Sequence, residues 1–167
     1  MKIAIVSDTH GNVANFKKLI KWLNEQDIIV LFHAGDIGSV ESLKESLEEF
    51  KGEMFGVLGN MDSKYRDRLG DYNRLKNVFI EEEVFEKEID EKKIAVTHLP
   101  QRAKELAKSG KYDLIFYGHT HTPWEWKEEN CQLINPGELA GQIFKPTFAV
   151  YDTKTGGLEL KLLEKLN

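Results

Sequence analysis

Side chains that can bind metal ions follow five apolar segments of this sequence. The segments are KIAIVS, IIVLFHAG, MFGVLG, KIAVT and LIFYG. The residues at or just beyond their ends are two carboxylates, one amide and four of the five histidines: Asp8, His10, Asp36, Asn60, His98, His119 and His121. If the segments are strands, these side chains gather at the carboxyl edge of a sheet, where open α/β sheets bind ligands.

The mixture of ligand types suits a pair of divalent transition-metal ions. Imidazole favours Mn, Fe, Ni or Zn over Mg, and carboxylate and amide oxygens raise the coordination number above that of a closed zinc site. Two ions about 3.5–4 Å apart need a shared anionic ligand, which one aspartate can supply. In the pairs Asp8/His10 and His119/His121 the spacing of two residues would place both side chains on one side of an extended backbone.

Each of these short stretches also has an ordinary structural interpretation. SDTH, GDIG and GNMD taken singly indicate turns, because Gly, Asp and Asn favour turns. His33, in FHAGD, we interpret as a structural residue rather than a ligand. The joint pattern favours metal binding, since turn chemistry does not require a ligand type at every strand end.

The apolar patterns predict an α/β fold with two mixed β-sheets and helices outside them. Helices are expected at 13–23, 40–50 and 100–109, with Ser39 as the N-cap of the second. In the first half, strands expected at 2–6, 28–32 and 54–58 alternate with helices, which implies parallel strands with crossover helices. Further strands are expected at 78–80, 93–98, 114–117, 132–135, 147–152 and 158–163. Trp124 and Trp126 suggest a hairpin arm.

Composition narrows the class of protein. A length of 167 residues predicts one domain, 1–167, and a single cysteine, Cys131, excludes an internal disulfide. No apolar run approaches the roughly 20 residues that cross a bilayer, so we expect a soluble cytoplasmic protein.

The net charge of -5 argues against a nucleic-acid partner. It still permits an anionic substrate if metal ions supply positive charge. The oligomeric state stays open, a homo-oligomer included.

Taken in order, SDTHGN, GDIG, GNMD, THL and GHTH resemble the calcineurin-like metallophosphoesterase superfamily, and NPGE at 135–138 resembles its small YfcE-like phosphodiesterase branch. The resemblance covers essentially the whole chain. It implies a four-layer αββα sandwich and a metal-dependent phosphodiesterase that hydrolyses a small phosphate ester. The implied cofactors are two divalent transition-metal ions, with Mn²⁺ or Ni²⁺ expected first and Fe or Zn as alternatives.

The resemblance also implies two ligand sets. The first ion would be held by Asp8, His10, Asp36 and His121. The second would be held by Asp36, Asn60, His98 and His119, with Asp36 bridging. Asp36, Asn60 and His98 are therefore our candidate catalytic residues. A water or hydroxide between the ions would be the nucleophile.

Two positions depart from the family pattern. Met61 stands where many members carry a histidine that stabilises the transition state or protonates the leaving group. Leu99-Pro100 follows His98 where the branch commonly has glycine. These departures bear on rate and substrate range more than on metal binding.

Two further questions stay open at this stage. The basic stretch 63–76 is either a lid over the site or, as we favour, a solvated helix. The alternatives to a phosphodiesterase are a non-catalytic interaction module on the same fold, as in the retromer subunit that resembles these enzymes, and a nuclease. The complete ligand set argues against an interaction module, and the net negative charge of the chain argues against a nuclease.

Overall fold

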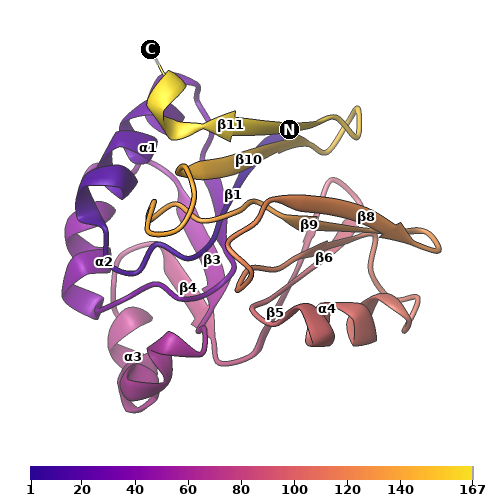
Figure 1. Ribbon diagram of the computed structural model, residues 1–167, viewed down its shortest axis with the longest axis horizontal. Coiled ribbons are helices and arrows are strands. Elements are labelled where there is room, and N and C mark those ends of the chain that lie inside the picture. The colour runs from indigo at the N-terminus through magenta and orange to yellow at the C-terminus, as the bar shows by residue number, and fades with distance from the viewer. Residues whose placement is uncertain (167) are drawn as a thin grey trace.

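The computed structural model describes residues 1–166 and shows two β-sheets packed face to face, with helices on both outer sides (Figure 1). The first sheet has the strand order β11-β10-β1-β2-β3-β4. Its strands are β1 (Lys2–Val6), β2 (Val30–His33), β3 (Glu53–Val57), β4 (Val78–Glu81), β10 (Thr147–Asp152) and β11 (Leu158–Leu162). Strands β1 to β4 are parallel, β10 pairs antiparallel with β1, and β11 pairs antiparallel with β10.

The second sheet has the order β5-β6-β7-β9-β8. Its strands are β5 (Val84–Ile89), β6 (Lys92–Thr97), β7 (Leu114–Phe116), β8 (Trp124–Glu128) and β9 (Cys131–Asn135). The central three strands are parallel, and β5 and β8 close the edges antiparallel. Both sheets are therefore mixed, as predicted, and the hairpin of β8 and β9 contains the expected tryptophan arm.

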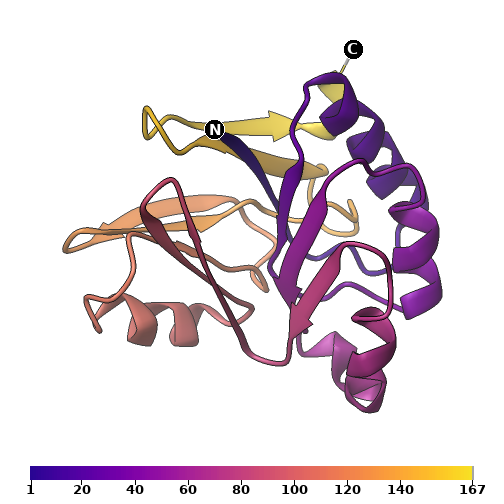
Figure 2. The ribbon, with the colours of Figure 1, turned by 180° about the vertical axis from the view of Figure 1, so that it is seen from behind.

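Helices cover the outer faces of the two sheets. Helices α1 (Val13–Glu25), α2 (Val40–Ser46) and α3 (Leu69–Tyr72) lie outside the first sheet, and α4 (Pro100–Ala107) lies outside the second (Figure 2). Two short 3₁₀ helices, η1 (Met61–Arg68) and η2 (Leu163–Lys165), complete the structure. The arrangement is the four-layer sandwich that the resemblance implied. No helix within residues 1–166 has the length and apolar character needed to span a membrane.

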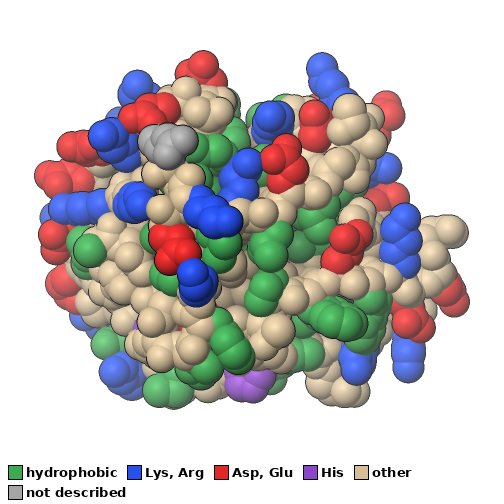
Figure 3. Space-filling model, turned by 45° about the horizontal axis from the view of Figure 1, so that its top comes forward, with side chains coloured by type: hydrophobic (Ala, Val, Ile, Leu, Met, Phe, Trp, Pro, Cys, Tyr) green, Lys and Arg blue, Asp and Glu red, His purple; other side chains and the backbone are tan. Residues whose placement is uncertain are grey.

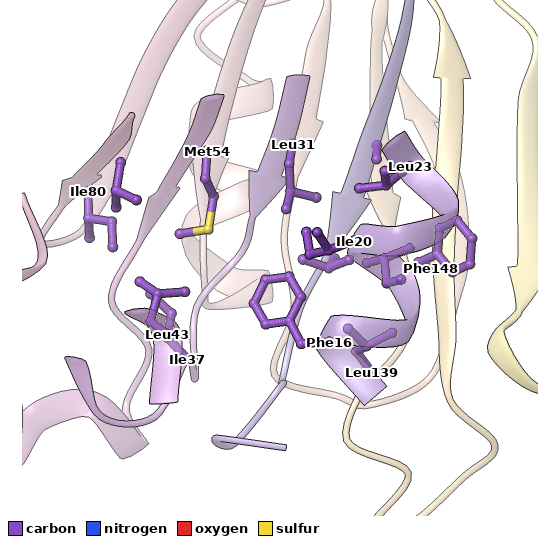
Figure 4. Packing of buried hydrophobic residues seen from close by; sticks show 14 of the residues in the cluster. Phe16, Ile20, Leu23, Leu31, Ile37, Leu43, Met54, Ile80, Leu139 and Phe148 are labelled. Atoms are coloured by element: carbon purple, nitrogen blue, oxygen red, sulfur yellow. The ribbon is translucent and has the colours of Figure 1, made fainter. Parts of the chain in front are cut away.

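Strand β1 shows how the layers are joined, because its side chains alternate between two cores. Ile3 and Ile5 pack in the core between the sheets. Ala4 and Val6 pack in the core between the first sheet and its helices. Figure 4 shows part of the core between the first sheet and its helices, where α1 faces the strands. A strand buried on both faces is typical of parallel sheets covered by helices.

Helix α2 is shorter than its apolar pattern predicted. Ser39 caps it as expected, because its side chain accepts a hydrogen bond from the Ser42 N–H. The helix then ends at Ser46 rather than at residue 50. Asn24 of α1 explains the difference, since its side chain donates to the Glu49 carbonyl and accepts from the Lys51 N–H. These bonds hold the chain in turns before β3.

Two strand expectations also need correction. Strand β2 begins at Val30, two residues later than expected, and β5 was not expected at all. Strand β5, VFEKEI, is a charged edge strand with one buried residue, so its apolar signal is weak. Its turn to β6 uses Asp90 and Glu91, both with positive φ, rather than the Asn-Gly or Asp-Gly pairs typical of hairpins.

Candidate metal centre

All seven sequence-predicted ligands lie in loops that leave the carboxyl ends of strands. The loops after β1, β2 and β3 carry Asp8, His10, Asp36 and Asn60, and the loops after β6 and β7 carry His98, His119 and His121. The site therefore lies where the strand ends of both sheets meet. In Figure 3 a histidine reaches the surface between hydrophobic side chains.

The first group consists of Asp8, His10 and His121. The Nε2 atoms of the two histidines are 3.3 Å apart. Asp8 Oδ1 lies 3.4 Å from His121 Nε2 and 3.9 Å from His10 Nε2. This oxygen is buried and has no hydrogen-bond partner among the residues that the structure describes. An unpaired buried carboxylate oxygen is costly, and a cation between it and the two imidazoles would satisfy it.

The second group centres on Asn60. Its Oδ1 lies 2.9 Å from His98 Nε2 and 2.8 Å from His119 Nδ1. Both imidazole nitrogens thus converge on one amide oxygen. His98 Nδ1 lies 2.8 Å from the Ala34 carbonyl, to which it donates, so Nε2 is the ring atom left for a ligand.

Asp36 lies between the two groups. Its Oδ2 is 3.5 Å from His98 Nε2 and 3.9 Å from His10 Nε2. Its Oδ1 accepts a hydrogen bond from the Met61 N–H at 2.8 Å, which fixes the carboxylate. Asp36 is therefore the side chain placed to serve both groups. The chemistry of the complete donor set, imidazole with carboxylate and amide oxygen, fits divalent transition metals.

The backbone at the ligands is not extended, which corrects the spacing argument made from the sequence. Asp8, His10, His119 and His121 all have positive φ, between 46° and 72°, and Asp36 has φ 55°. Such values are uncommon outside glycine and mark strained positions that cluster at functional sites. Hydrogen bonds hold the strained turns, among them that from the His10 N–H to the Asp36 carbonyl and that from the His119 N–H to Asp8 Oδ2.

Gly118 allows the loops of the two sheets to meet. A Cβ atom at this position would lie 1.8 Å from Ser7 Oγ and 2.7 Å from Asp8 Oδ2. Any side chain here would therefore displace Ser7 and Asp8. The glycine is required for close approach rather than for a special backbone angle.

Burial and charge act in opposite directions on the ionisable groups of the site. Burial raises the pKa of Asp8. Burial also disfavours ionised Asp36, but the hydrogen bond and charge of His98 outweigh it and lower its pKa. The pKa of His98 is correspondingly raised, because Asp36 and Asp8 outweigh the burial that would lower it. The two carboxylates thus favour positive charge at this position, which a bound cation would supply.

Glu138 is a residue of the site that the sequence did not reveal. It is fully buried, and its Oε2 lies 3.2 Å from His121 Nδ1. Its carboxylate also accepts hydrogen bonds from the N–H groups of Gln142, Ile143 and Phe144. A carboxylate that receives the second ring nitrogen of a histidine fixes the tautomer and orientation for a metal at the first. The available signal was the NPGE stretch at 135–138, whose glutamate was noted as part of a motif but given no role.

Asp62 was likewise hidden in a motif that we interpreted as a turn. It is buried and accepts hydrogen bonds from the N–H groups of Ile37, Gly38 and Gly59. These donors belong to the two loops that carry Asp36 and Asn60. Asp62 therefore holds the two loops in register.

His33 has the structural place assigned to it. Its Nε2 lies 2.9 Å from Thr9 Oγ1, and its Nδ1 accepts from the Gly35 N–H at 3.2 Å. Complete burial, followed by the nearby charge of His98, lowers its pKa to about 3. His33 is therefore a neutral residue that supports the Asp8–His10 turn through its contact with Thr9.

The basic stretch 63–76 fits the solvated interpretation better than a lid. Arg68 pairs with Glu41 at 2.8 Å, and Arg74 pairs with Asp71 at 2.7 Å. These side chains are engaged by surface carboxylates. Arg66 is likewise paired, with Glu82 at 3.1 Å, and in addition lines a pocket that Asn60 also lines.

A two-sheet sandwich with this cluster of Asp, His and Asn side chains defines a metallophosphoesterase type of protein. Residues 1–156 match the model of the calcineurin-like phosphoesterase superfamily domain, and the chain belongs to that superfamily. The resemblance stated from the motifs is thereby confirmed.

Particular relatives refine this placement. The chain is 35% identical over 160 residues to Phosphodiesterase MJ0936 of Methanocaldococcus jannaschii, covering 92% of this chain and 94% of the relative. A solved archaeal phosphodiesterase superposes with a TM-score of 0.87 at 30% identity, covering 97% of this chain and 99% of the other.

More distant structures share the fold. YfcE of E. coli superposes with a TM-score of 0.64 at 16% identity, covering 98% and 100% of the two chains. Vacuolar protein sorting 29 of Cryptosporidium parvum superposes with a TM-score of 0.66 at 20% identity, covering 96% of this chain and 95% of the other. The two-sheet sandwich is thus common to chains that differ widely in sequence.

Proposed function

We propose that this chain is a metal-dependent phosphodiesterase that hydrolyses a small phosphate diester at a two-ion centre. One observation carries the proposal: the donor atoms of seven side chains form a continuous chain of contacts that includes a buried Asp8 oxygen without a partner. The 35% identical relative named as a phosphodiesterase supports the choice of a diester.

The proposed ligand sets follow the two groups in the structure. Asp8, His10 and His121 would hold one ion, and Asn60, His98 and His119 the other, with Asp36 shared between them. Two divalent cations at these positions, Mn²⁺ or Ni²⁺ first among them, would supply an activated water near neutral pH and neutralise phosphoryl charge.

The side chains of the chain itself orient and hold this centre. The Ala34 carbonyl fixes the ring of His98, and Glu138 fixes that of His121. Asn60 is exposed, and its Nδ2 makes no hydrogen bond within the part of the chain that the structure describes. This amide nitrogen is therefore available to donate to a phosphoryl oxygen of the substrate. Met61, beside it, is 58% exposed and has no proton to give to a leaving group.

The test is hydrolysis of bis(p-nitrophenyl) phosphate by protein stripped with chelator and reloaded with single metals. We expect activity with Mn²⁺ or Ni²⁺, little without metal, and a lower rate on the monoester p-nitrophenyl phosphate. His121→Ala should lose most of the activity, whereas Thr122→Ala, an exposed neighbour in the same loop, should keep it. A protein that binds metal but hydrolyses neither ester would instead be an interaction module.

A further inference from the structure

A pocket of about 190 Å³ opens beside the candidate metal centre. Asn60 and His98 are among its lining residues, so whatever fills it lies next to the proposed reaction site. Its walls come from η1, from the turn between β4 and β5, and from the start of α4. The volume is below the roughly 300 Å³ at which pockets for whole drug-sized ligands begin, so it suits one ring system.

The charged side chains of the pocket balance one another. Arg66 and Arg102 face it from η1 and α4, and Glu82 and Glu83 face it from the turn. Arg66 pairs with Glu82 at 3.1 Å, and Arg102 pairs with Glu105 of its own helix at 3.1 Å. A second phosphate would meet two carboxylates here and arginines that are already paired. A neutral group with both donors and acceptors matches this wall better.

Apolar surface completes the pocket next to the metal centre. Leu58 is buried beneath it, and Leu99 is 44% exposed although it directly follows His98. Leu99 is one of the two departures from the family pattern. Its side chain therefore adds an apolar wall at the place where a glycine would leave none.

We propose that this pocket binds the base of a nucleoside attached to the scissile phosphate, so that the substrate is a nucleotide diester. The inference rests on the proposed phosphodiesterase function. Planar guanidinium groups stack on nucleobases, and a glutamate accepts hydrogen bonds from an exocyclic amino group. Leu58 and Leu99 would contact the ring face. Leu99, Arg102 and Glu83 are then specificity-determining residues.

The experiment compares three diesters with the same p-nitrophenolate leaving group. Their second arm is adenosine (through its 5′ oxygen), phenyl or methyl. We expect the highest kcat/KM for the adenosine ester. Arg102→Gln and Glu83→Gln should each lower its advantage over the methyl ester by roughly tenfold, the scale of a lost stacking contact for Arg102 and of a hydrogen bond to a charged group for Glu83. Arg74→Gln, an arginine paired with Asp71 away from the pocket, should leave both rates unchanged.

A second measurement does not depend on activity. Titration of adenosine into chelator-treated protein, followed by calorimetry or NMR, should show saturable binding that Arg102→Gln weakens and Arg74→Gln does not. The inference is overturned if adenosine does not bind, if the phenyl ester matches the adenosine ester, or if the variants affect the methyl ester equally. Failure to hydrolyse any of the esters would reject the phosphodiesterase function instead, and adenosine binding would still decide the pocket.

Discussion

His33 makes the stability of this protein depend on pH in a direction that the structure determines. The ring is fully buried, and both of its nitrogens are engaged as a neutral imidazole by Thr9 and Gly35. Burial lowers its pKa from an ordinary value of 6.5 to about 3. The unfolded chain therefore binds a proton between these two pH values that the folded chain does not.

The sign and size of the effect follow from this difference. The contribution of His33 to stability is fully present above pH 6.5 and is lost progressively as pH falls toward 3. Each unit of pH below 6.5 costs about 1.36 kcal/mol, so at pH 5 the free energy of unfolding should be lower by about 2 kcal/mol through this residue alone.

The assay is urea unfolding of chelator-treated protein at pH 7.5 and pH 5, for the wild type and for His33→Asn. The variant lacks the titrating group, although its carbonyl oxygen can still accept from Gly35. We expect it to be less stable than the wild type at pH 7.5, with the difference shrinking by about 2 kcal/mol at pH 5. Comparing the two proteins cancels the titration of the other histidines. A difference that stays constant between the two pH values would refute the assignment of a buried neutral His33.

Three further predictions concern the site. His119→Ala and His121→Ala should each lose a different ion, since the two rings lie in different groups. Anomalous scattering from Mn-soaked crystals of each variant would show which ion is lost. Loss of the same ion by both variants would make the grouping wrong. Glu138→Gln should weaken metal affinity by about 10–100-fold in chelator competition and also lower stability, because one buried oxygen that accepts from N–H groups becomes an amide donor. Met61→His should raise kcat on esters with poor leaving groups more than on nitrophenyl esters, by up to about 10²-fold, if the imidazole reaches the leaving oxygen. The measurement is kcat/KM against leaving-group pKa for wild type and variant, and equal slopes for the two proteins would place position 61 away from the leaving oxygen.

The strand ends that carry the site could be predicted because buried parallel strands are short apolar runs with clear limits. That signal placed Asp36 and Asn60 at the carboxyl edge of the sheet, although the conformation of the loops that carry them was unknown. The same reasoning failed on backbone conformation, because the positive φ of His10 and His119 is held by hydrogen bonds between loops distant in sequence.

Supporting residues were harder to predict than ligands. Glu138 and Asp62 work through backbone N–H groups and through another side chain, so their role depends on tertiary contacts that no local pattern encodes. Strand β5 escaped notice for a related reason, since an edge strand with charged side chains gains most of its order from pairing with β6.

The most direct test of the two-ion centre is the metal content per chain of wild type and Asp36→Ala, measured by elemental analysis after loading with Mn²⁺ and removal of excess. The shared position of Asp36 leads us to expect two ions in the wild type and at most one in the variant. Asp67→Ala, a change at an exposed aspartate outside the site, should retain both ions. One ion in the wild type, or two in Asp36→Ala, would contradict the account.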